Sequence, residues 1–551
     1  MTEPTTDRQT IAQLLQQGLF HHRRGEIPQA MQRYGEVLEI DQKNAEALYY
    51  VAVIACQEGQ FKQGVDLVRR ALTLVPPEAR MLNLLGQALD RLGQPLEAAK
   101  AIDQAIALDP KLAAAHANRA NLLVDAGLPA EALKSFDKAL ELDPNAPAEL
   151  INRGALLELF ARPEDALKDY EQALRVAPNA AEVHANRGAV LKDIGLLDIA
   201  AGKADTPRFA EAIAAYDSAV KLKRGMHEAF AARGQIKLMT GDWVGGFNDY
   251  DHRAEFENTP FKAMTAPRWH GEPRPGERIV LVAEQGLGDI IQFSRFAPVL
   301  AAQGHDVTVL VRKGMAPLLS TLHGVTIISD AEELTRDARP MRWAPLMSVP
   351  TLLATTPETL PRDVPYLAAD PARVAAWKEK LGAAKFKVGI NWSPGNPDRT
   401  VLAERQLPLP AFHTLAAIPG VELISLQKGA PTRDIKGVAF RDKIRTIDAD
   451  PNPEADFFLD TAAVMMNLDL VVGCDTSIVH LAGALGRPVF TAVPIVSDWR
   501  WMLNRDDSPW YPTMRVFRQT AAAQWGPVFE SIAKAARELS TFMQTPVSGL
   551  S

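Results

Sequence analysis

The chain has 551 residues, 47% of them hydrophobic, and a formal net charge of −7. It is too long for one hydrophobic core, so we expect several domains, and its charge gives no support for nucleic-acid binding. The only cysteines, Cys56 and Cys474, are too far apart to indicate a disulfide framework or a CxxC metal site. The start, MTEPTTDRQT, lacks the regions of a signal peptide, and no stretch reaches the roughly 18 apolar residues of a membrane span. A cytoplasmic protein is therefore expected.

Residues 11–260 repeat one pattern of small, apolar and turn residues with a period of 34. A small residue recurs at the eighth position of each unit, as at Gly86 and Gly154, and another at the twentieth, as at Ala98 and Ala166. Such residues let the two helices of a hairpin approach closely. A 34-residue helix-turn-helix repeat resembles the tetratricopeptide family, whose solenoids are built to hold another polypeptide.

A polar residue recurs on the first helix of three units. Asn118, Asn152 and Asn186 each occupy the sixth position, and each is followed by an arginine. An amide both donates to and accepts from a peptide backbone, which suits binding of an extended chain; hydrogen bonding between helices of the array is the alternative. The region resembles the O-linked N-acetylglucosamine transferases, whose asparagine ladder grips substrate polypeptide. That resemblance implies an acceptor-binding role for these three residues.

Two segments interrupt or end the repeats. The sixth unit contains an insertion of about twelve residues between Gly195 and Ala212, which we expect to form a longer surface turn. Residues 261–278 are rich in proline and indicate a linker.

After the linker, apolar runs of strand length alternate with helical segments, which is the pattern of a parallel sheet. A first lobe, 279–370, and a second lobe, 371–540, describe the GT-B glycosyltransferase architecture of two Rossmann-like lobes. The expected fold is therefore an all-α tetratricopeptide solenoid followed by an α/β GT-B module. Strands are expected at 279–284, 306–312, 325–329, 387–392, 421–427, 468–473 and 488–493, and a helix from Ile290 to about Gln303.

The loop after the first expected strand contains Gly286, Gly288 and Asp289. The glycines allow a tight turn, and the acid lies at a helix start, where it can be only a cap. The loop resembles the GD loop of bacterial heptosyltransferases, which are inverting GT-B enzymes. The resemblance implies that Asp289 is the general base for an acceptor hydroxyl and that the glycines contact the donor. Glu284 and His305 are lesser candidates for the base.

The loop after strand 468–473 contains Asp475, Thr476 and Ser477 and leads into a helix with His480. Hydroxyls and unpaired N–H groups at a helix start form an anion site, although such a loop can also be a plain helix cap. The segment resembles the D-T-[GS]-x-x-H-L-A-[GA] signature of heptosyltransferase-like enzymes, which binds nucleotide-sugar phosphates. These four residues are therefore expected to bind the donor, with His480 either a ligand contact or a buried histidine.

Three polar residues follow other expected strands of the second lobe: Ser393, Arg405 and Lys428. A hydroxyl, an arginine and a lysine at strand ends can neutralise a leaving phosphate, although Arg405 and Lys428 can also be ordinary surface charges. No DxD motif, HExxH motif or Cys/His cluster is expected to offer a metal site, which favours transfer without a metal. No cofactor is expected beyond the nucleotide-activated sugar itself, CMP- or UDP-linked.

Residues 498–519 are rich in aromatic residues and arginines. The aromatics can stack on a sugar or pack against the other lobe, and the arginines can bind the carboxylate of an acidic sugar. The residues concerned are Trp499, Trp501, Trp510 and Tyr511, with Arg500, Arg505 and Arg515.

From residue 11 to about 540 the chain resembles the tetratricopeptide-containing bacterial protein glycosyltransferases, among them alphaproteobacterial flagellin glycosyltransferases. The resemblance rests on domain order and on the segments EQGLGD and CDTSIVHLAGA. It implies transfer of a nonulosonic acid such as pseudaminic acid to Ser or Thr of flagellin, which the repeats would bind. Two alternatives stay open: a carbohydrate or lipid glycosyltransferase docked by its repeats, and a non-catalytic repeat scaffold.

Overall fold

The computed structural model describes residues 3–203, 206–256, 259–336, 339–383, 386–394, 405–447, 457–521 and 524–544. The chain divides into two compact units, Met1–Val190 and Leu191–Ser551. Within the described ranges, no helix combines the length and the apolar character that a membrane crossing requires.

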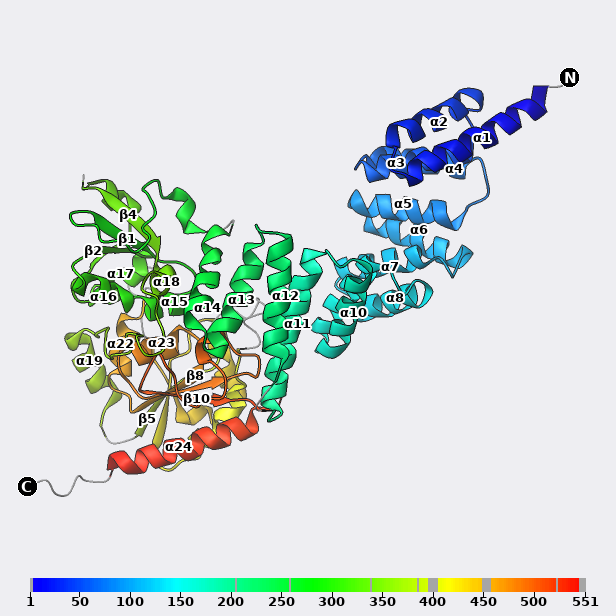
Figure 1. Ribbon diagram of the computed structural model, residues 1–551. Coiled ribbons are helices and arrows are strands. Elements are labelled where there is room, and N and C mark those ends of the chain that lie inside the picture. The colour runs from blue at the N-terminus through cyan, green and yellow to red at the C-terminus, as the bar shows by residue number, and fades with distance from the viewer. Residues whose placement is uncertain are drawn as a thin grey trace, which may run out of the picture. The chain divides into compact units, whose positions relative to one another are not determined.

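The first unit is all helical, and each helix packs against the next along the chain (Figure 1). Close packing follows from the small residue at the eighth position of each repeat, as predicted. A Cβ on Gly86 would lie 2.4 Å from Ile102 Cγ1, and one on Gly154 would lie 2.7 Å from Tyr170 Cε1. The helices are α1 (Glu3–Arg23), α2 (Ile27–Ile40), α3 (Ala45–Gln57), α4 (Phe61–Leu72), α5 (Ala79–Arg91), α6 (Pro95–Leu108), α7 (Ala113–Asp125), α8 (Pro129–Leu142), α9 (Pro147–Leu159) and α10 (Pro163–Val176).

The arginine that follows the recurring asparagine holds consecutive repeats together. Arg153 donates to Asp169 of its own repeat at 2.8 and 2.6 Å and to Asp137 of the preceding repeat at 2.9 Å. Arg233, which holds the same position of its repeat although it follows Ala232, makes the equivalent pair of bonds to Asp249 at 2.7 and 2.6 Å. Asp169 is buried, so this arginine has a structural role.

The remaining helices of the repeat region start with α11 (Ala181–Ala200), within which the division between the two units falls. We expected the insertion in the sixth repeat to form a longer turn, and this prediction is wrong. The insertion instead lengthens the first helix of that repeat to Ala200. Only the short segment before Arg208 remains as a connection, and part of it lies outside the described residues. The helices are α11 (Ala181–Ala200), α12 (Arg208–Leu222), α13 (His227–Thr240) and α14 (Trp243–Tyr250), followed by the 3-10 turn η1 (Asp251–Glu255).

A four-stranded parallel sheet follows, in the order β3-β2-β1-β4. Its three predicted strands are confirmed, and β4 adds one that was not predicted. The prediction of a single helix after β1 is wrong, since the chain forms two short helices there. The strands are β1 (Arg278–Val282), β2 (Asp306–Leu310), β3 (Thr326–Ile328) and β4 (Met341–Pro345), and the helices are α15 (Leu287–Phe293), α16 (Phe296–Ala302), α17 (Ala316–Leu319) and α18 (Val349–Leu352).

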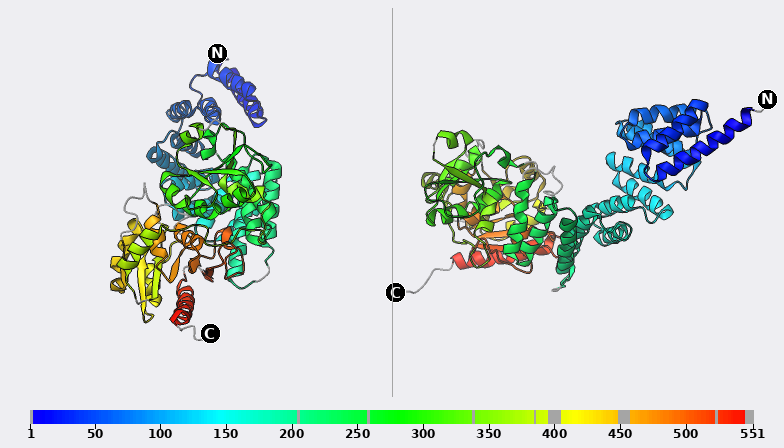
Figure 2. Two further views of the ribbon diagram at one scale, coloured as in Figure 1. Left: turned by 90° about the vertical axis from the view of Figure 1, so that its left-hand side faces the viewer. Right: turned by 45° about the horizontal axis from the view of Figure 1, so that its top comes forward.

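The second sheet has six parallel strands in the order β10-β9-β8-β5-β6-β7. Its core includes Trp392, Phe412 and Phe529. The C-terminal helix α24, the red helix of Figure 2, packs beside β10 and α21. The four predicted strands are confirmed, and β7 and β10 are additional. The strands are β5 (Phe386–Asn391), β6 (Val421–Ser425), β7 (Ile444–Thr446), β8 (Leu470–Cys474), β9 (Val489–Val493) and β10 (Met514–Arg518), and the helices are α19 (Pro371–Leu381), α21 (His413–Ala416), α22 (Leu459–Met465), α23 (Ser477–Ala484) and α24 (Gly526–Gln544).

The last repeat packs directly on the α/β part of the second unit. Trp243 stacks on Trp510 with ring centroids 5.4 Å apart. Arg253 Nη2 donates to Glu284 Oε1 at 2.6 Å, and both side chains are buried. The expected boundary at residue 260 is therefore not where the compact units divide.

The segment expected as a linker is also folded against the smaller sheet. Trp269 N–H donates to the Trp343 carbonyl at 2.7 Å, and Trp343 N–H donates to the Pro267 carbonyl at 3.1 Å. This pairing places the segment beside β4. Residues 267–269 therefore pair with the edge strand β4 and are not a free connection.

Candidate functional site

A cavity of about 510 Å³ lies in the second unit where one loop from each sheet meets. The loop after β1 enters α15, and the loop after β8 enters α23. Eight of the residues predicted for the site line this cavity: Gly286, Gly288, Asp289, Arg405, Asp475, Thr476, Ser477 and His480. The other lining residues are Gln235, Tyr250, Gln285, Leu287, Arg312, Pro394, Asp498 and Arg500.

Gly288 is needed where the two loops approach each other. A Cβ at this position would lie 2.9 Å from His480 Cδ2 and 3.5 Å from Ser477 Cα. Any side chain would therefore push α15 away from α23. This glycine brings the two helix starts together, a role additional to the tight turn and the donor contact predicted for it.

Asp289 lies in the first turn of α15, and both of its carboxylate oxygens accept hydrogen bonds. Oδ2 accepts from Gly286 N–H at 2.9 Å, and Oδ1 accepts from Arg500 Nη2 at 2.5 Å. The first bond is that of a helix cap, the simpler role considered above. The side chain still has 22% of its surface exposed, facing the cavity that it lines.

Arg500 is buried and has a partner for each part of its guanidinium. Nε donates to Gln292 Oε1 at 2.7 Å and Nη1 to Asp498 Oδ1 at 2.9 Å, in addition to the bond to Asp289. Burial alone would lower the pKa of Arg500, but the carboxylates of Asp498 and Asp289 outweigh it and raise that pKa. Arg500 is therefore a fixed positive charge that joins the segment after β9 to α15.

A second charged group lies at the start of α23. Asp475 is buried, with Arg405 Nη1 3.3 Å from its Oδ2 and His480 Nε2 3.7 Å from its Oδ1. Burial opposes ionisation, yet the positive charge of Arg405 holds the pKa of Asp475 well below its usual range. The charge of Asp475 in turn raises the pKa of Arg405. Arg405 keeps 31% of its side chain exposed and is a cation that a ligand can reach.

His480 fits both of its predicted roles. It is buried, Nδ1 is 3.1 Å from the Tyr511 hydroxyl, and its ring stacks on Trp501. It also lines the cavity. Thr476, the residue before α23, donates from Oγ1 to Asn391 Oδ1 at 2.8 Å, which ties the loop to the end of β5.

Ser393 and Lys428 do not line the cavity, unlike the other predicted donor-binding residues. The Ser393 backbone is held by Gln427, whose Oε1 accepts from Ser393 N–H at 2.9 Å. Lys428 Nζ lies 5.7 Å from the Phe458 ring centroid. Only Pro394, next to Ser393, reaches the cavity, and residues 395–404 lie outside the described residues.

The two lesser candidates for the base do not line the cavity either. Glu284 is paired with Arg253, and burial raises the pKa of Glu284. His305 contacts Trp269 edge to face at 5.2 Å.

The aromatic and basic stretch 498–519 mainly packs. Trp499, Trp501, Trp510 and Tyr511 are all buried, so the packing alternative holds for them rather than an open sugar platform. Arg505 is paired with Asp507 at 2.7 Å, and Arg515 lies over the Phe517 ring at 5.2 Å. Of the three arginines predicted for a sugar carboxylate, only Arg500 lines the cavity. Each of its three guanidinium nitrogens already donates a hydrogen bond to another side chain of the protein.

Several cavity residues were not predicted, among them Arg312, Gln235 and Tyr250. Arg312 lies two residues beyond the end of β2 and donates to the Gln285 carbonyl at 3.1 Å; its place near a strand end was the signal that could have found it. Gln235 and Tyr250 come from the last repeat, and the repeat pattern itself does not indicate them.

Two Asp-x-Asp spacings, which can hold a divalent cation, occur in the chain. Asp249 pairs with Arg233, and Asp251 pairs with Arg268 at 2.8 Å. The second spacing, at 448–450, lies outside the described residues. In the described ranges, no three histidine, cysteine or acidic side chains are grouped to hold a metal ion.

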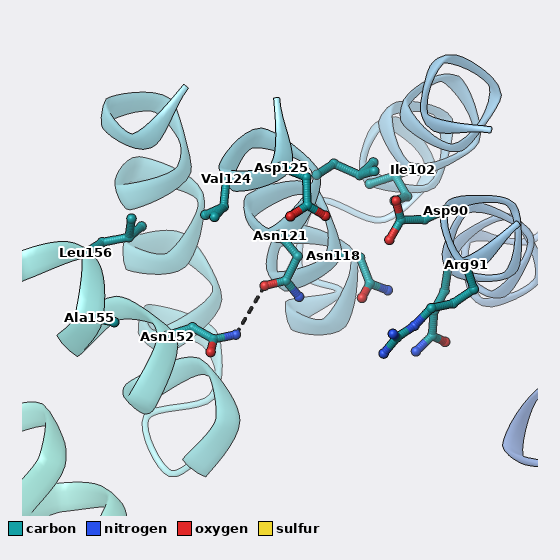
Figure 3. A pocket seen from close by; sticks show the side chains of 12 residues that line it. Asp90, Arg91, Ile102, Asn118, Asn121, Val124, Asp125, Asn152, Ala155 and Leu156 are labelled. Atoms are coloured by element: carbon teal, nitrogen blue, oxygen red, sulfur yellow. Dashed lines mark hydrogen bonds between the residues drawn. The ribbon is translucent and has the colours of Figure 1, made fainter. Parts of the chain in front are cut away.

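A separate cavity of about 480 Å³ lies in the first unit and contains two of the recurring asparagines (Figure 3). Asn118 Nδ2 donates to Asn83 Oδ1 at 2.8 Å, and Asn152 Nδ2 donates to Asn121 Oδ1 at 3.1 Å. These bonds are the inter-helix alternative, but the same amides also face the cavity. Asn186, on α11, does not line it.

Comparisons with known proteins agree with the repeat region. Residues 83–147 match the tetratricopeptide repeat family. Protein FlbA of Caulobacter vibrioides is 29% identical over 339 residues, which are 56% of this chain and 55% of that protein, so the chain spans about half the length of this relative.

Two solved structures have low overall similarity. The structure of Pseudomonas aeruginosa pilF is 22% identical, covering 41% of this chain and 96% of that one with a TM-score of 0.36. A thermophilic tetratricopeptide protein of Thermus thermophilus is 18% identical, covering 35% and 99% with a TM-score of 0.28. The chain therefore carries tetratricopeptide repeats and, beyond them, parallel α/β sheets, and it is similar to FlbA over about half its length.

Proposed function

We propose that this protein is a cytoplasmic protein O-glycosyltransferase with a GT-B-type module. It would move a sugar from a nucleotide-activated donor to a Ser or Thr hydroxyl. The observation that carries the proposal is the meeting of the loops after β1 and β8 around one cavity. Ligands of open α/β sheets bind beyond the carboxyl ends of strands, and about 510 Å³ is within the usual range for a small-molecule site.

The donor phosphates would bind at the start of α23, beside Arg405. The first N–H groups of a helix have no intrahelical acceptor, and the first helical bonds of α23 come from Val479 and His480 to the Thr476 carbonyl. Arg405 supplies a reachable positive charge for the leaving phosphate. Arg312 lines the same cavity and adds a second one.

Asp289 would act as the general base. The acceptor oxygen forms a bond to the anomeric carbon, the bond from that carbon to the phosphate oxygen breaks, and the hydroxyl proton passes to Asp289. Arg500 and the Gly286 N–H hold the carboxylate in one orientation. A fixed carboxylate is what proton transfer at a defined position requires.

The acceptor would be bound by the repeats, through Asn118, Asn152 and Asn186. On the resemblance of the EQGLGD and CDTSIVHLAGA segments, we propose flagellin as the acceptor and a nonulosonic acid such as pseudaminic acid as the sugar. Replacing all three asparagines by Ala should raise the KM for the acceptor and leave donor hydrolysis unchanged. The melting temperature checks the fold, since two amide-amide bonds are lost as well.

Nucleotide binding is the direct test of the donor site. The nucleotide of the donor, chosen from CMP, UDP and GDP, should stabilise the protein by about 2.7 kcal/mol at 100 times its dissociation constant. Arg405→Ala should weaken this binding by roughly tenfold or more, through loss of a charge-assisted hydrogen bond. Lys428→Ala is the matched control because Lys428 lies outside the cavity lining.

Failure of all three nucleotides to bind would contradict the proposal. An equal loss of affinity in Lys428→Ala would place the phosphates elsewhere. Mass spectrometry of flagellin from cells with and without the gene tests the acceptor. A change in a glycolipid with unmodified flagellin would favour the carbohydrate or lipid transferase.

A further inference from the structure

Two residues of the last repeat form part of the cavity wall: Gln235 of α13 and Tyr250 of α14. The Tyr250 hydroxyl lies 3.5 Å from Gln285 Oε1 in the loop after β1, and its ring meets Trp499 at 5.7 Å. The last repeat is therefore fixed against the loops that carry the site.

Gln235 occupies the ninth position of its repeat, which begins at His227. The ninth position also carries an amide in two earlier repeats, at Gln87 and Asn121. Both of those side chains line the cavity of the first unit, together with Asn118. Three repeats therefore carry an amide at this position of their first helix, and in each of the three that amide lines a cavity.

Gln235 is half-buried, and within the described part of the chain its amide makes no hydrogen bond. Four charged side chains of the cavity are engaged with each other: Asp289 with Arg500, and Asp475 with Arg405. A primary amide offers two donors and an acceptor, which match the C=O and N–H groups of a peptide backbone. Gln235 is the uncharged group of this cavity best suited to hold a polypeptide of any sequence.

We infer that Gln235 positions the backbone of the acceptor polypeptide at the cavity, so that the last repeat sets which hydroxyl reaches Asp289. The inference rests on the proposed function and deepens it. Gln235 is a positioning residue, since the transfer chemistry is assigned to other groups.

The test uses the full chain with purified flagellin as acceptor and CMP-pseudaminic acid as donor. Gln235→Ala removes the amide, and Gln235→Leu removes it while keeping most of the side-chain volume. Both should raise the KM for flagellin roughly three- to tenfold, the cost of a neutral hydrogen bond. Both should leave release of CMP in the absence of flagellin unchanged. Gln303→Ala, the same change at an exposed site outside the cavity lining, is the control and should leave both rates unchanged.

The outcomes separate the inference from the proposed function. Wild-type KM in both Gln235 variants, with transfer intact, would overturn the inference and leave the proposed function standing. Absence of transfer and of CMP release in the wild type would overturn the proposed function and the inference with it. If either variant lowers the melting temperature, Gln235→Glu keeps the shape and an acceptor oxygen but loses the N–H donors, and an intermediate KM supports the inference.

Discussion

Arg500 Nη2 lies 2.5 Å from Asp289 Oδ1, joining the segment after β9 to the first turn of the helix after β1. The pair lies at the cavity, and Arg500 is 5% exposed. A buried charge that loses its partner is costly, because its desolvation is no longer offset. The same ion pair therefore bears on both the chemistry and the stability of the second unit.

For the chemistry, Asp289→Asn should lower turnover by roughly 10²–10⁴-fold, because the amide cannot take the acceptor proton. Nucleotide affinity should stay near that of the wild type, because Asn can still accept from the Gly286 N–H. Single-turnover transfer and nucleotide titration measure the two effects. Near-normal turnover would leave Asp289 as a helix cap only.

For stability, Arg500→Met should lower the free energy of unfolding by about 3–5 kcal/mol, because it leaves the carboxylates of Asp289 and Asp498 without their buried partner. Arg505→Met is the matched control, since Arg505 pairs with the exposed Asp507. A surface ion pair contributes about 0–1 kcal/mol. Urea titration measures the free energy of unfolding of both variants. Similar losses would show that Arg500 stabilises the protein no more than a surface ion pair does.

The repeat region was predictable because its signal is local and recurs. A small eighth residue at a period of 34 is sufficient to predict a close helix pair, and Gly86 against Ile102 shows the contact. The insertion was misread because its residues form helix as readily as turn. The strands at 279–284 and 387–392 were found as continuous apolar runs. β4 was missed because Met341–Pro345 contains an arginine and a proline.

The candidate site was predictable only in part, because only some of its residues belong to a local sequence pattern. The glycine-containing loop before α15 and the hydroxyl-containing loop before α23 could be located because each follows an apolar strand. The role of Arg500 could not, because its partner Asp289 is 211 residues away in the sequence and nothing local indicates the contact. Gln235 belongs to a helical repeat, and nothing in the repeat pattern indicates that the α/β loops lie beside it.

Gly288→Ala should disturb the approach of the two loops, because the new Cβ would lie 2.9 Å from His480 Cδ2. Either α15 or the His480 ring must shift. We expect a loss of roughly 1–3 kcal/mol of stability, typical of overpacking, and weaker nucleotide binding. Gly437→Ala is the matched control, with no atom within 4 Å of its Cβ. Unchanged melting and affinity in Gly288→Ala would mean that the two helix starts are not in tight contact.

The position of the last repeat changes where the chain can be divided. Residues 261–551 would lack Trp243, Phe247 and Arg253, which pack on Trp510, on Trp499 and on Glu284. That fragment should be insoluble or melt without cooperativity. Residues 181–551, which keep α11 whole, should melt cooperatively and bind nucleotide. Cooperative melting of residues 261–551 at the same temperature would show that the repeat is dispensable for the α/β fold.

The last prediction concerns the acid stability of the loop before α23. Asp475 is buried, and despite that burial the positive charge of Arg405 lowers its pKa in the folded protein. In the unfolded chain an aspartate titrates near 3.9. Because the folded pKa is the lower one, ionised Asp475 stabilises the protein above about pH 4, and this contribution is lost as the pH falls through the folded pKa.

Asp475→Asn removes this contribution, so the wild type should exceed the variant in free energy of unfolding by a constant amount between about pH 5 and 7. The difference should narrow below about pH 4, where the unfolded wild-type chain takes up a proton that the folded state resists. Asp442→Asn, at a side chain with 90% of its surface exposed, controls for the loss of one negative charge. Urea unfolding at each pH measures the difference. A gap that widens as the pH falls would mean that Asp475 is protonated in the folded protein and that Arg405 is held by Asp498 instead.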